Sequence, residues 1–245
     1  MPAQYGIIGY PLSQSFSPAY FTKKFAAEGI DASYTAFPLE NIADLPALLA
    51  QNPDLQGLNV TIPHKQAVIP YLDELSDEAR AIGAVNCIAI QNGRTKGYNT
   101  DATGFEQSLK PLLGAAHTQA LVLGTGGASR AVTWVLDQLG IGYQKVSRTA
   151  GPDAICYEDI TPELMQQHLL VINTTPLGMY PQTGAFPSIP YDALETSHIL
   201  YDLIYNPERT SFLSIGRQYG ATIKNGLEML YLQAEAGWSI WQEKR

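Results

Sequence analysis

Lys65 ends the heptapeptide NVTIPHK at residues 59–65, which lies where an expected strand gives way to a helix that Pro63 would start. Open α/β sheets bind ligands beyond the carboxyl ends of their strands. A lysine there can give a proton to an alkoxide as a hydride reaches a carbonyl carbon, and can take it back in reverse. The alternative is a solvated lysine at a helix start, since lysine side chains are usually exposed. For His64, with no other histidine or cysteine nearby, we expect a structural role rather than metal binding.

Asp101 and Asn86 are two further candidates for chemistry. Asp101 begins an expected helix, where a carboxylate caps the helix or complements its dipole. It could equally orient the lysine ammonium and hydrogen-bond a substrate, and the spacing leaves both interpretations open. Asn86 stands within an expected apolar strand over residues 84–91, so its amide must be hydrogen-bonded to protein or ligand if it is buried.

Hydroxyl and amide side chains gather in two other segments. Ser13, Ser15 and Ser17 come next to an expected helix start, where hydroxyls and backbone amides could bind a carboxylate. Capping by Ser17, with Pro18 in the first helical position, explains only one of the three serines. The segment NTTPLGM at residues 173–179 follows an apolar strand, and it either lines a nicotinamide pocket or forms a polar turn.

A glycine-rich turn, GTGGAS at residues 124–129, joins an expected buried strand at 120–123 to an expected helix at 128–139. Glycines let backbone amides approach an anion, and the helix dipole favours negative charge, so the arrangement predicts a phosphate cradle. Ser129 stands where the dinucleotide fingerprint prefers Gly or Ala. An ordinary glycine-rich turn between strand and helix is the alternative.

The next expected strand, at residues 143–146, runs into Ser147, Arg148 and Thr149, and no carboxylate comes before Asp153. NAD-binding proteins place an acidic residue near this point to hold the ribose hydroxyls. A guanidinium with two hydroxyls suits a 2′-phosphate instead, which favours NADP over NAD. The alternative interpretation of Arg148 is a solvated loop cation.

Short apolar runs alternate with helical patterns through the chain, which predicts an α/β fold. An Asn-Gly turn at residues 92–93 between two such runs predicts a hairpin, so the first sheet should be mixed. The first unit is expected over roughly the opening hundred residues, and a dinucleotide-binding unit begins near Thr103. A cofactor on one unit would meet a substrate on the other in a cleft between them.

The composition of the 245-residue chain limits its class. Charged residues make up 16% and apolar ones 45%, which is typical of an ordered globular protein. A net charge of -8 without a basic cluster argues against a nucleic-acid partner. No signal peptide or membrane-spanning run is recognisable, and two isolated cysteines predict a reduced, cytoplasmic protein.

With these motifs in order, the chain resembles the shikimate dehydrogenase family over nearly its whole length. The stretches that carry the resemblance are GYP with SxSP (9–18), NVTIPHK (59–65), GAVN (83–86), GxNTDxxG (97–104), GxGGASR (124–130), NxTPxGM (173–179), DLxYxPxxT (202–210) and GLxMLxxQA (226–234). Any one of them is weak evidence, but the whole set in register is specific.

The resemblance implies an N-terminal open mixed-sheet α/β substrate domain plus a Rossmann-type dinucleotide-binding domain. The first domain would comprise residues 1–102 and 225–245 and the second residues 103–224, so that the last helix returns to the first domain. The implied activity is the reversible reduction of 3-dehydroshikimate to shikimate with NADPH, a step of aromatic amino-acid biosynthesis. No metal is expected, and monomer and homodimer both stay open.

Family roles fall on matching positions of this chain. Lys65 would be the acid/base and Asp101 its partner. The residues expected to hold the substrate's carboxylate and ring hydroxyls are Ser15, Ser17, Thr61, Asn86, Tyr205 and Gln233. The residues expected to bind the cofactor are Gly124, Gly126, Gly127, Ala128, Ser147, Arg148, Thr149, Met179 and Gly226, with Met179 near the nicotinamide.

One departure from the family pattern bears on the cofactor. The family often has Asn at the position of Ser147 and a second basic residue soon after Arg148, whereas residues 150–153 supply none. Two alternatives therefore accompany the family interpretation. One is a quinate/shikimate dehydrogenase of dual substrate or dual cofactor use, since a single pocket residue could admit an extra hydroxyl. The other is a non-catalytic metabolite-sensing homologue, against which the retention of Lys65 and Asp101 argues.

Overall fold

The structure, a computed structural model, describes residues 2–13 and 15–243. Gln14, in the serine-rich segment, and residues 1 and 244–245, which the expected first domain includes, lie outside the described residues. By its internal contacts the chain divides into two compact units. The first comprises Met1–Thr100 and Ala234–Arg245, and the second comprises Asp101–Gln233.

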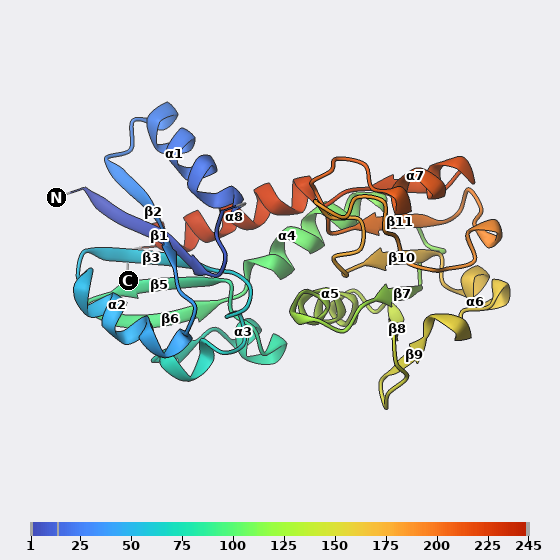
Figure 1. Ribbon diagram of the computed structural model, residues 1–245, viewed down its shortest axis with the longest axis horizontal. Helices are drawn as coiled ribbons and strands as arrows, with labels where there is room; N and C mark the ends of the chain where they lie inside the picture. The colour runs from blue at the N-terminus through green and yellow to red at the C-terminus, as the bar shows by residue number, and fades with distance from the viewer. Residues whose placement is uncertain (1, 14, 244–245) are drawn as a thin grey trace. The chain divides into compact units, whose positions relative to one another are not determined.

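The first unit is built on a six-stranded mixed sheet with the strand order β2-β1-β3-β5-β6-β4 (Figure 1). Its strands are β1 (Ala3–Gly9), β2 (Ala32–Pro38), β3 (Leu55–Val60), β4 (Glu74–Leu75), β5 (Cys87–Gln91) and β6 (Arg94–Tyr98). β1 is parallel to β2 and β3, whereas β5 is antiparallel to β3 and β6. Asn92 and Gly93 have φ values of 52° and 75°, as a tight hairpin turn needs. The expected hairpin and mixed sheet are confirmed.

Helices cover both faces of this sheet (Figure 1). α1 (Phe16–Glu28) and the end of α8 (Leu227–Gln242) supply one core, where Tyr5, Phe21 and Trp241 pack together. α2 (Leu45–Gln51) and α3 (Asp77–Ile82) supply a second core that includes Leu45 and Leu58. Two short 3-10 helices, η1 (Ile42–Asp44) and η2 (Ile69–Tyr71), complete the unit.

Gly57 allows the last helix to approach the first sheet. A Cβ at Gly57 would lie 2.3 Å from the indole nitrogen of Trp241, so only glycine leaves room for that ring on β3. The indole N–H donates to the Ile88 carbonyl at 2.9 Å, and the ring stacks on Tyr5 with 4.9 Å between centroids. Trp241 thereby fixes the end of α8 to three strands.

The second unit holds a six-stranded sheet with the order β12-β11-β10-β7-β8-β9. Its strands are β7 (Gln119–Leu123), β8 (Gly142–Ser147), β9 (Ala154–Cys156), β10 (Leu170–Asn173), β11 (Ile199–Asp202) and β12 (Thr222–Lys224). Every neighbouring pair is parallel. Read from β9, this is the doubly wound strand order of a Rossmann fold. The expected α/β class with a Rossmann-type domain is confirmed.

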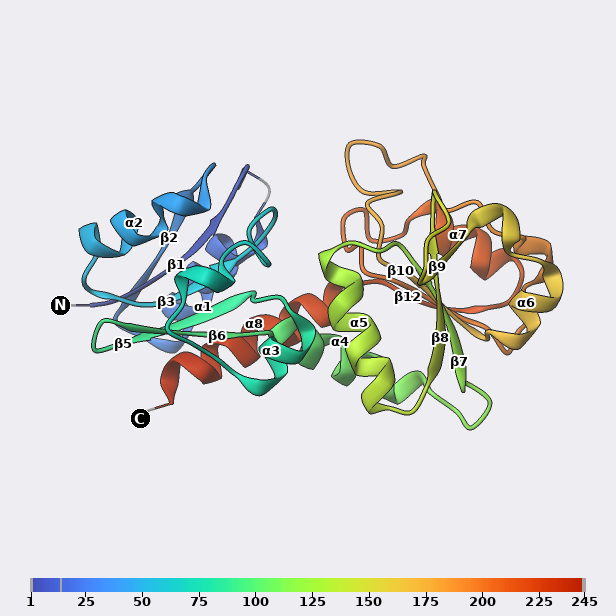
Figure 2. The same ribbon diagram turned by 90° about the horizontal axis from the view of Figure 1, so that it is seen from below.

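The helices of the second unit are α4 (Thr100–Leu109), α5 (Gly127–Gln138), α6 (Pro162–Gln167), α7 (Ser211–Gln218) and the beginning of α8, with 3-10 helices η3 (Lys110–Leu112), η4 (Tyr157–Asp159) and η5 (Tyr191–Ala193). Figure 2 shows α5 on one side of this sheet and α6 and α7 on the other. A Cβ at Gly104 would lie 2.5 Å from the Met229 carbonyl oxygen, so α4 and α8 pack backbone to backbone there. No helix in the described part of the chain has the length and apolar character to cross a membrane.

Two local expectations are wrong. α1 begins at Phe16 with Ser15 as its N-cap residue, so Ser17 does not cap the helix but lies buried within it. Phe16 stacks on Tyr20 one turn later, which favours the earlier start. No helix starts at Pro63 either, because residues 61–68 form turns.

The turn after β3 has an identifiable cause. The Lys65 carbonyl accepts a hydrogen bond from the Val85 amide at 2.7 Å, so it is engaged by a distant segment rather than by a helical neighbour. The chain then enters η2 directly, with the Ile69 amide bonded to the Gln66 carbonyl at 3.2 Å. Tertiary pairing therefore overrides the helix that Pro63 indicated.

Candidate active site

Motifs that are far apart in the sequence meet at one edge of the first sheet. Thr61 directly follows β3, Asn86 directly precedes β5, and Thr100 comes shortly after β6. β5 runs antiparallel between β3 and β6, with Asn59 paired to Cys87 in register. The end of β3, the start of β5 and the end of β6 therefore share this edge, which is where α/β sheets bind ligands.

Asn86 is buried at this edge, and its side chain is bonded to protein. Oδ1 accepts from the Thr100 amide at 2.7 Å, and Nδ2 donates to the Thr100 hydroxyl oxygen at 3.0 Å. The Asn86 carbonyl accepts from the Val60 amide at 2.8 Å. Asn86 thus lies just before β5 rather than inside the longer strand expected at 84–91, and it joins the start of α4 to the end of β3.

Lys65 lies in the turn after β3 with its side chain half-buried. The bond from the Val85 amide to its carbonyl joins this turn to the segment that carries Asn86. His64 is buried, and its Nε2 donates to the Leu39 carbonyl at 2.5 Å. This bond accounts for His64 as a structural residue that fixes the backbone beside Lys65.

A series of polar side chains, of which Tyr34 is half-buried and the others are buried, leads from Ser17 to Asn86. The Tyr34 hydroxyl donates to Asn59 Oδ1 at 2.6 Å, and the nearby Ser17 side chain lowers the pKa of the Tyr34 phenol. Asn59 Nδ2 donates to the Asn86 carbonyl at 3.3 Å. Burial raises the pKa of the Tyr34 phenol well above its usual value, so the hydroxyl stays neutral. Sequence reasoning misses Tyr34, because a tyrosine in an edge strand belongs to no recognisable motif.

Asp101, Tyr205 and Gln233 belong to the second unit. Asp101 follows Thr100 in the first turn of α4, where its carboxylate complements the helix dipole. Tyr205 is half-buried after β11, and burial raises the pKa of its phenol. Gln233 is buried on α8, where its Nε2 donates to the Leu230 carbonyl at 2.9 Å. Asp101 and Gln233 are therefore carried by helices, and Tyr205 by a loop beyond a strand end.

The glycine-rich turn joins β7 to α5, as the sequence predicts. Gly124 has a φ of 108°, and a Cβ there would come 2.7 Å from the Thr174 hydroxyl oxygen, so this position requires glycine. Gly126 is the N-cap residue of α5, where no side chain caps the helix and nothing lies within 4 Å of the place a Cβ would occupy. Ser129 is buried, and its hydroxyl donates to the Gly126 carbonyl at 2.7 Å. Open space at the amino end of this helix fits a diphosphate.

Gly127 and Ala128 open α5 beside this space, and both are half-buried. Because β8 is the parallel neighbour of β7, the turn at Ser147 lies at the same edge of the sheet. The Thr149 amide donates to the Ser147 hydroxyl oxygen at 3.2 Å, which closes this turn. Arg148 is exposed on this turn.

Asn173 and Asp202 end the neighbouring strands β10 and β11, paired in register and fully buried. Asn173 Nδ2 donates to Asp202 Oδ1 at 3.0 Å, and the Thr210 hydroxyl donates to Asp202 Oδ2 at 2.6 Å. Burial raises the pKa of the Asp202 carboxyl to about 6, although its hydrogen bonds act in the opposite direction. Sequence reasoning gave Asp202 no role, although a carboxylate that ends an apolar strand is a signal that could have found it.

Met179 and Gly226 occupy different surroundings. Met179, in the segment after β10, is 47% exposed, and its amide donates to the Pro176 carbonyl at 3.1 Å. An exposed thioether beyond a strand end suits contact with an aromatic ring. A Cβ at Gly226 would lie 2.1 Å from the Leu203 carbonyl oxygen. Glycine at that position therefore has a packing reason that the sequence did not indicate.

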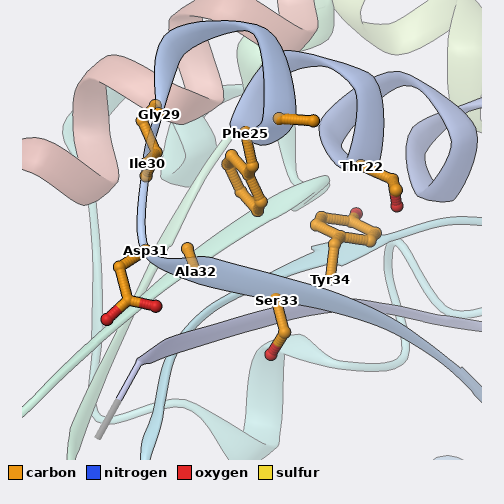
Figure 3. Close-up of a pocket in the computed structure, with 9 residues that line it drawn as sticks. Thr22, Phe25, Gly29, Ile30, Asp31, Ala32, Ser33 and Tyr34 are labelled. Carbon is orange, nitrogen blue, oxygen red and sulfur yellow. The ribbon is translucent and has the colours of Figure 1, made fainter.

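A hollow of about 570 Å³ lies between the end of α1 and the beginning of β2 (Figure 3). Thr22, Phe25 and Tyr34 are among the residues that line it, and Asp31 supplies its one charged side chain. Because β1, β2 and β3 are parallel, the beginning of β2 lies at the opposite end of the strands from Thr61. The hollow therefore opens away from the sheet edge that carries Thr61, although Tyr34 belongs both to its lining and to the series that reaches Asn86.

The parallel sheet, with its glycine-rich turn after the first strand, defines a dinucleotide-binding α/β protein. A sequence model described as the shikimate dehydrogenase substrate binding domain matches residues 7–88. A protein of Methanococcus maripaludis named shikimate dehydrogenase (NADP(+)) is 37% identical over 257 residues, covering 98% of this chain and 91% of that protein. The chain belongs to the shikimate dehydrogenase family.

Solved structures of relatives agree in fold. Shikimate 5-dehydrogenase from Thermus thermophilus, in complex with NADP(H) and shikimate, has a TM-score of 0.87 and 31% identity, covering 98% of this chain and 93% of that one. Shikimate 5-dehydrogenase from Listeria monocytogenes, in complex with shikimate and NAD, has a TM-score of 0.89 and 27% identity, covering 100% of this chain and 93% of that one. The likeness thus extends over both units.

Proposed function

We propose that this chain is an NADP-dependent shikimate dehydrogenase, which reversibly reduces 3-dehydroshikimate to shikimate in aromatic amino-acid biosynthesis. The observation that carries the proposal is the edge of the first sheet, where Thr61, Lys65 and Asn86 stand together in a chain of this family. The two isolated cysteines and the net charge of -8 support a cytoplasmic enzyme that acts on small molecules rather than on nucleic acid. Monomer and homodimer are both compatible with this activity.

NADP fits the residues of the second unit. The open space at Gly126 and the uncapped start of α5 would take the diphosphate, with Gly124, Gly127 and Ala128 completing the turn. Arg148 would pair with the 2′-phosphate between the hydroxyls of Ser147 and Thr149. Met179 would contact the nicotinamide, with Gly226 beside it. When bound, the reduced cofactor supplies the hydride.

Lys65 supplies the proton in this proposal. Its ammonium donates to the oxygen of the ring carbon that is reduced, and its amine takes the proton back when shikimate is oxidised. Asp101, in the first turn of α4, is its partner. The Val85 bond to the Lys65 carbonyl and the buried His64 hold the backbone from which the ammonium reaches.

The remaining candidates orient the substrate. Ser15 and Ser17, at the start of α1, would hold its carboxylate. The residues proposed to hold the ring hydroxyls are Thr61, Asn86, Tyr205 and Gln233. The bonds from Asn86 to Thr100 support this role, because they fix the amide before a substrate arrives.

An assay with two acids and two cofactors tests the proposal. Shikimate and quinate are each oxidised by the purified chain with NADP and with NAD, and NADPH or NADH formation is followed by absorbance. We expect the highest kcat/KM for shikimate with NADP. A comparable kcat/KM for quinate would indicate dual substrate use. A comparable kcat/KM with NAD, the cofactor bound in the structure of the Listeria relative, would indicate dual cofactor use. Shikimate binding without turnover would replace the proposal with a metabolite-sensing homologue.

A further inference from the structure

The Asp202 carboxylate is the centre of a buried hydrogen-bond cluster in the second unit. It is 0% exposed at the end of β11. Oδ1 accepts from Asn173 Nδ2 at 3.0 Å and from the Ile204 amide at 3.1 Å, and Oδ2 accepts from the Thr210 hydroxyl at 2.6 Å. The donors thus come from β10, from the segment after β11 and from the start of α7.

Asn173 extends the cluster into the segment after β10. Its Oδ1 accepts from the Thr175 amide at 3.0 Å and from the Thr175 hydroxyl at 2.6 Å. The Leu177 amide donates to the Thr175 hydroxyl oxygen at 3.2 Å. Because Asn173 and Asp202 are register partners, two adjacent side chains hold the segments 174–179 and 203–210.

The two segments also touch each other. Directly after the first segment, the Tyr180 amide donates to the Asn206 carbonyl at 3.4 Å. A Cβ at Gly178 would lie 3.3 Å from the Thr210 Cβ, in a backbone with a φ of 99°. A displacement of one segment therefore disturbs the other, and the Asp202 cluster lies where both begin.

Burying a carboxylate to hold two segments together costs folding free energy. A buried charge loses its hydration, and burial accordingly raises the pKa of the Asp202 carboxyl. A carboxylate differs from an amide in that both of its oxygens only accept, so every surrounding donor has a fixed direction. The acceptor-only carboxylate therefore fixes the positions of its donors, although its burial does not stabilise the folded protein.

We propose that Asp202 is a positioning residue, which acts through Asn173 and Thr210 to set the geometry of segments 174–179 and 203–210. The proposal rests on the proposed function, because Met179 and Tyr205 on these segments are the groups assigned to the nicotinamide and the substrate. Asp202 itself touches neither. Its effect on catalysis passes through the two segments.

Amide hydrogen exchange without ligands is the first test. Thr210→Val keeps the shape of the side chain but removes the hydroxyl, which donates to Asp202 and also accepts from the Leu213 amide at the start of α7. Asp202→Ala removes the acceptor. Both variants should exchange faster at the amides of Thr175, Leu177 and Ile204, whereas β7 should stay protected. The control is Tyr201→Phe, which deletes a buried hydroxyl bonded to Ser108 at 2.6 Å on the same strand. The control should leave both segments unchanged.

Kinetics provide the second readout. With NADP, kcat/KM for shikimate should fall about tenfold or more in Thr210→Val and Asp202→Ala, since small displacements of reacting groups are costly. Binding of 2′,5′-ADP should be unchanged, because that probe reports the site near Arg148 and not the two segments. Asp202→Asn should keep more activity than Asp202→Ala and less than wild type, since its amide oxygen keeps the Oδ1 contacts whereas its Nδ2 cannot accept from the Thr210 hydroxyl.

Two results would overturn the proposal. The first is wild-type exchange in both segments of Thr210→Val and Asp202→Ala. The second is loss of 2′,5′-ADP binding in parallel with activity, which would show general damage to the second unit. Failure of the proposed function is distinguishable, since wild-type protein would then oxidise no shikimate while the exchange result still stood.

Discussion

Each unit holds a group of polar side chains that includes residues at strand ends, but the two groups differ in charge. In the first unit, Ser17, Tyr34, Asn59 and Asn86 form a series of neutral groups. In the second unit, the corresponding cluster centres on the Asp202 carboxylate. Neutral amides and hydroxyls hold one geometry over a wide pH range, whereas a buried carboxylate also responds to protons.

This difference separates two tasks. In the first unit the titratable group proposed for catalysis, Lys65, lies beside a series of groups that do not change charge. In the second unit the cluster centres on the Asp202 carboxylate, which has no part in the proton transfer that we propose. The four predictions below test this separation.

The largest effect is expected at Lys65. Lys65→Ala should lower kcat by about two or more orders of magnitude, the usual scale for a lost acid/base, with a smaller change in shikimate affinity. Steady-state kinetics in both directions measure this. Lys96→Ala is the control, because Lys96 lies on β6 and its ammonium is 4.0 Å from Glu74. Near wild-type kcat in Lys65→Ala would remove this residue from the mechanism.

The second prediction concerns the charged cluster itself. The pKa of Asp202 is about 6 in the folded protein against an ordinary value of 3.8. The folded protein therefore binds the Asp202 proton more tightly than the unfolded chain does. The resulting contribution to the free energy of unfolding is fully present below pH 3.8 and is lost as the pH rises through about 6. The loss is about 3 kcal/mol for this shift.

Urea unfolding from pH 4.5 to 8 checks this linkage. Wild-type protein should lose stability relative to Asp202→Asn as the pH rises to about 6, and the difference should then stay constant. Tyr201→Phe should differ from wild type by the same amount at every pH. A constant difference for Asp202→Asn as well would contradict the raised pKa.

The third prediction separates cofactor binding from substrate binding. Gly126→Val would place a side chain in the open space before α5, so KM for NADP should rise about tenfold or more, which corresponds to about 1.4 kcal/mol. Shikimate affinity, measured by calorimetry without cofactor, should stay within about twofold of wild type. Gly114→Val is the matched control, since its Cβ would meet only the His117 ring at 3.7 Å. An equal loss of NADP and shikimate affinity in Gly126→Val would show that the two binding sites are not independent.

The smallest effect is expected in the neutral series. Tyr34→Phe keeps the ring stacked on Phe21 and removes the hydroxyl that donates to Asn59, so KM for shikimate should rise about threefold to tenfold, the range of one hydrogen bond. kcat should stay nearly constant. Tyr5→Phe is the control, because Tyr5 is the register partner of Tyr34 and its hydroxyl donates to Gln56 instead. Equal changes in both variants would show that Tyr34 serves only the core.

The elements that follow from local chemistry were predictable from the sequence. The hairpin depends on Asn92 and Gly93, and the phosphate turn depends on Gly124 and on the buried strand before it. In each case the residue type itself restricts the backbone. The candidate motifs at Thr61 and Asn86 also lie at one edge of the first sheet. This was predictable, because open α/β sheets bind ligands beyond the ends of their strands.

The errors arose where distant residues decide local structure. Ser17 fits a capping pattern, but the stacking of Phe16 on Tyr20 favours an earlier start at Phe16, so Ser17 lies within the helix. The helix at Pro63 is replaced by turns because Val85 engages the Lys65 carbonyl. Asp202 had no assigned role because its donors lie on three elements that only folding brings together.

The contact between Trp241 and Gly57 has a consequence for the order of synthesis. The helix that completes the core of the first unit is translated after the whole of the second unit. Until Trp241 emerges from the ribosome, the Tyr5 ring lacks its stacking partner and the Ile88 carbonyl lacks the indole N–H that donates to it. The unit that is made first is therefore the last to be finished, and the nascent chain must carry an open apolar surface through most of translation.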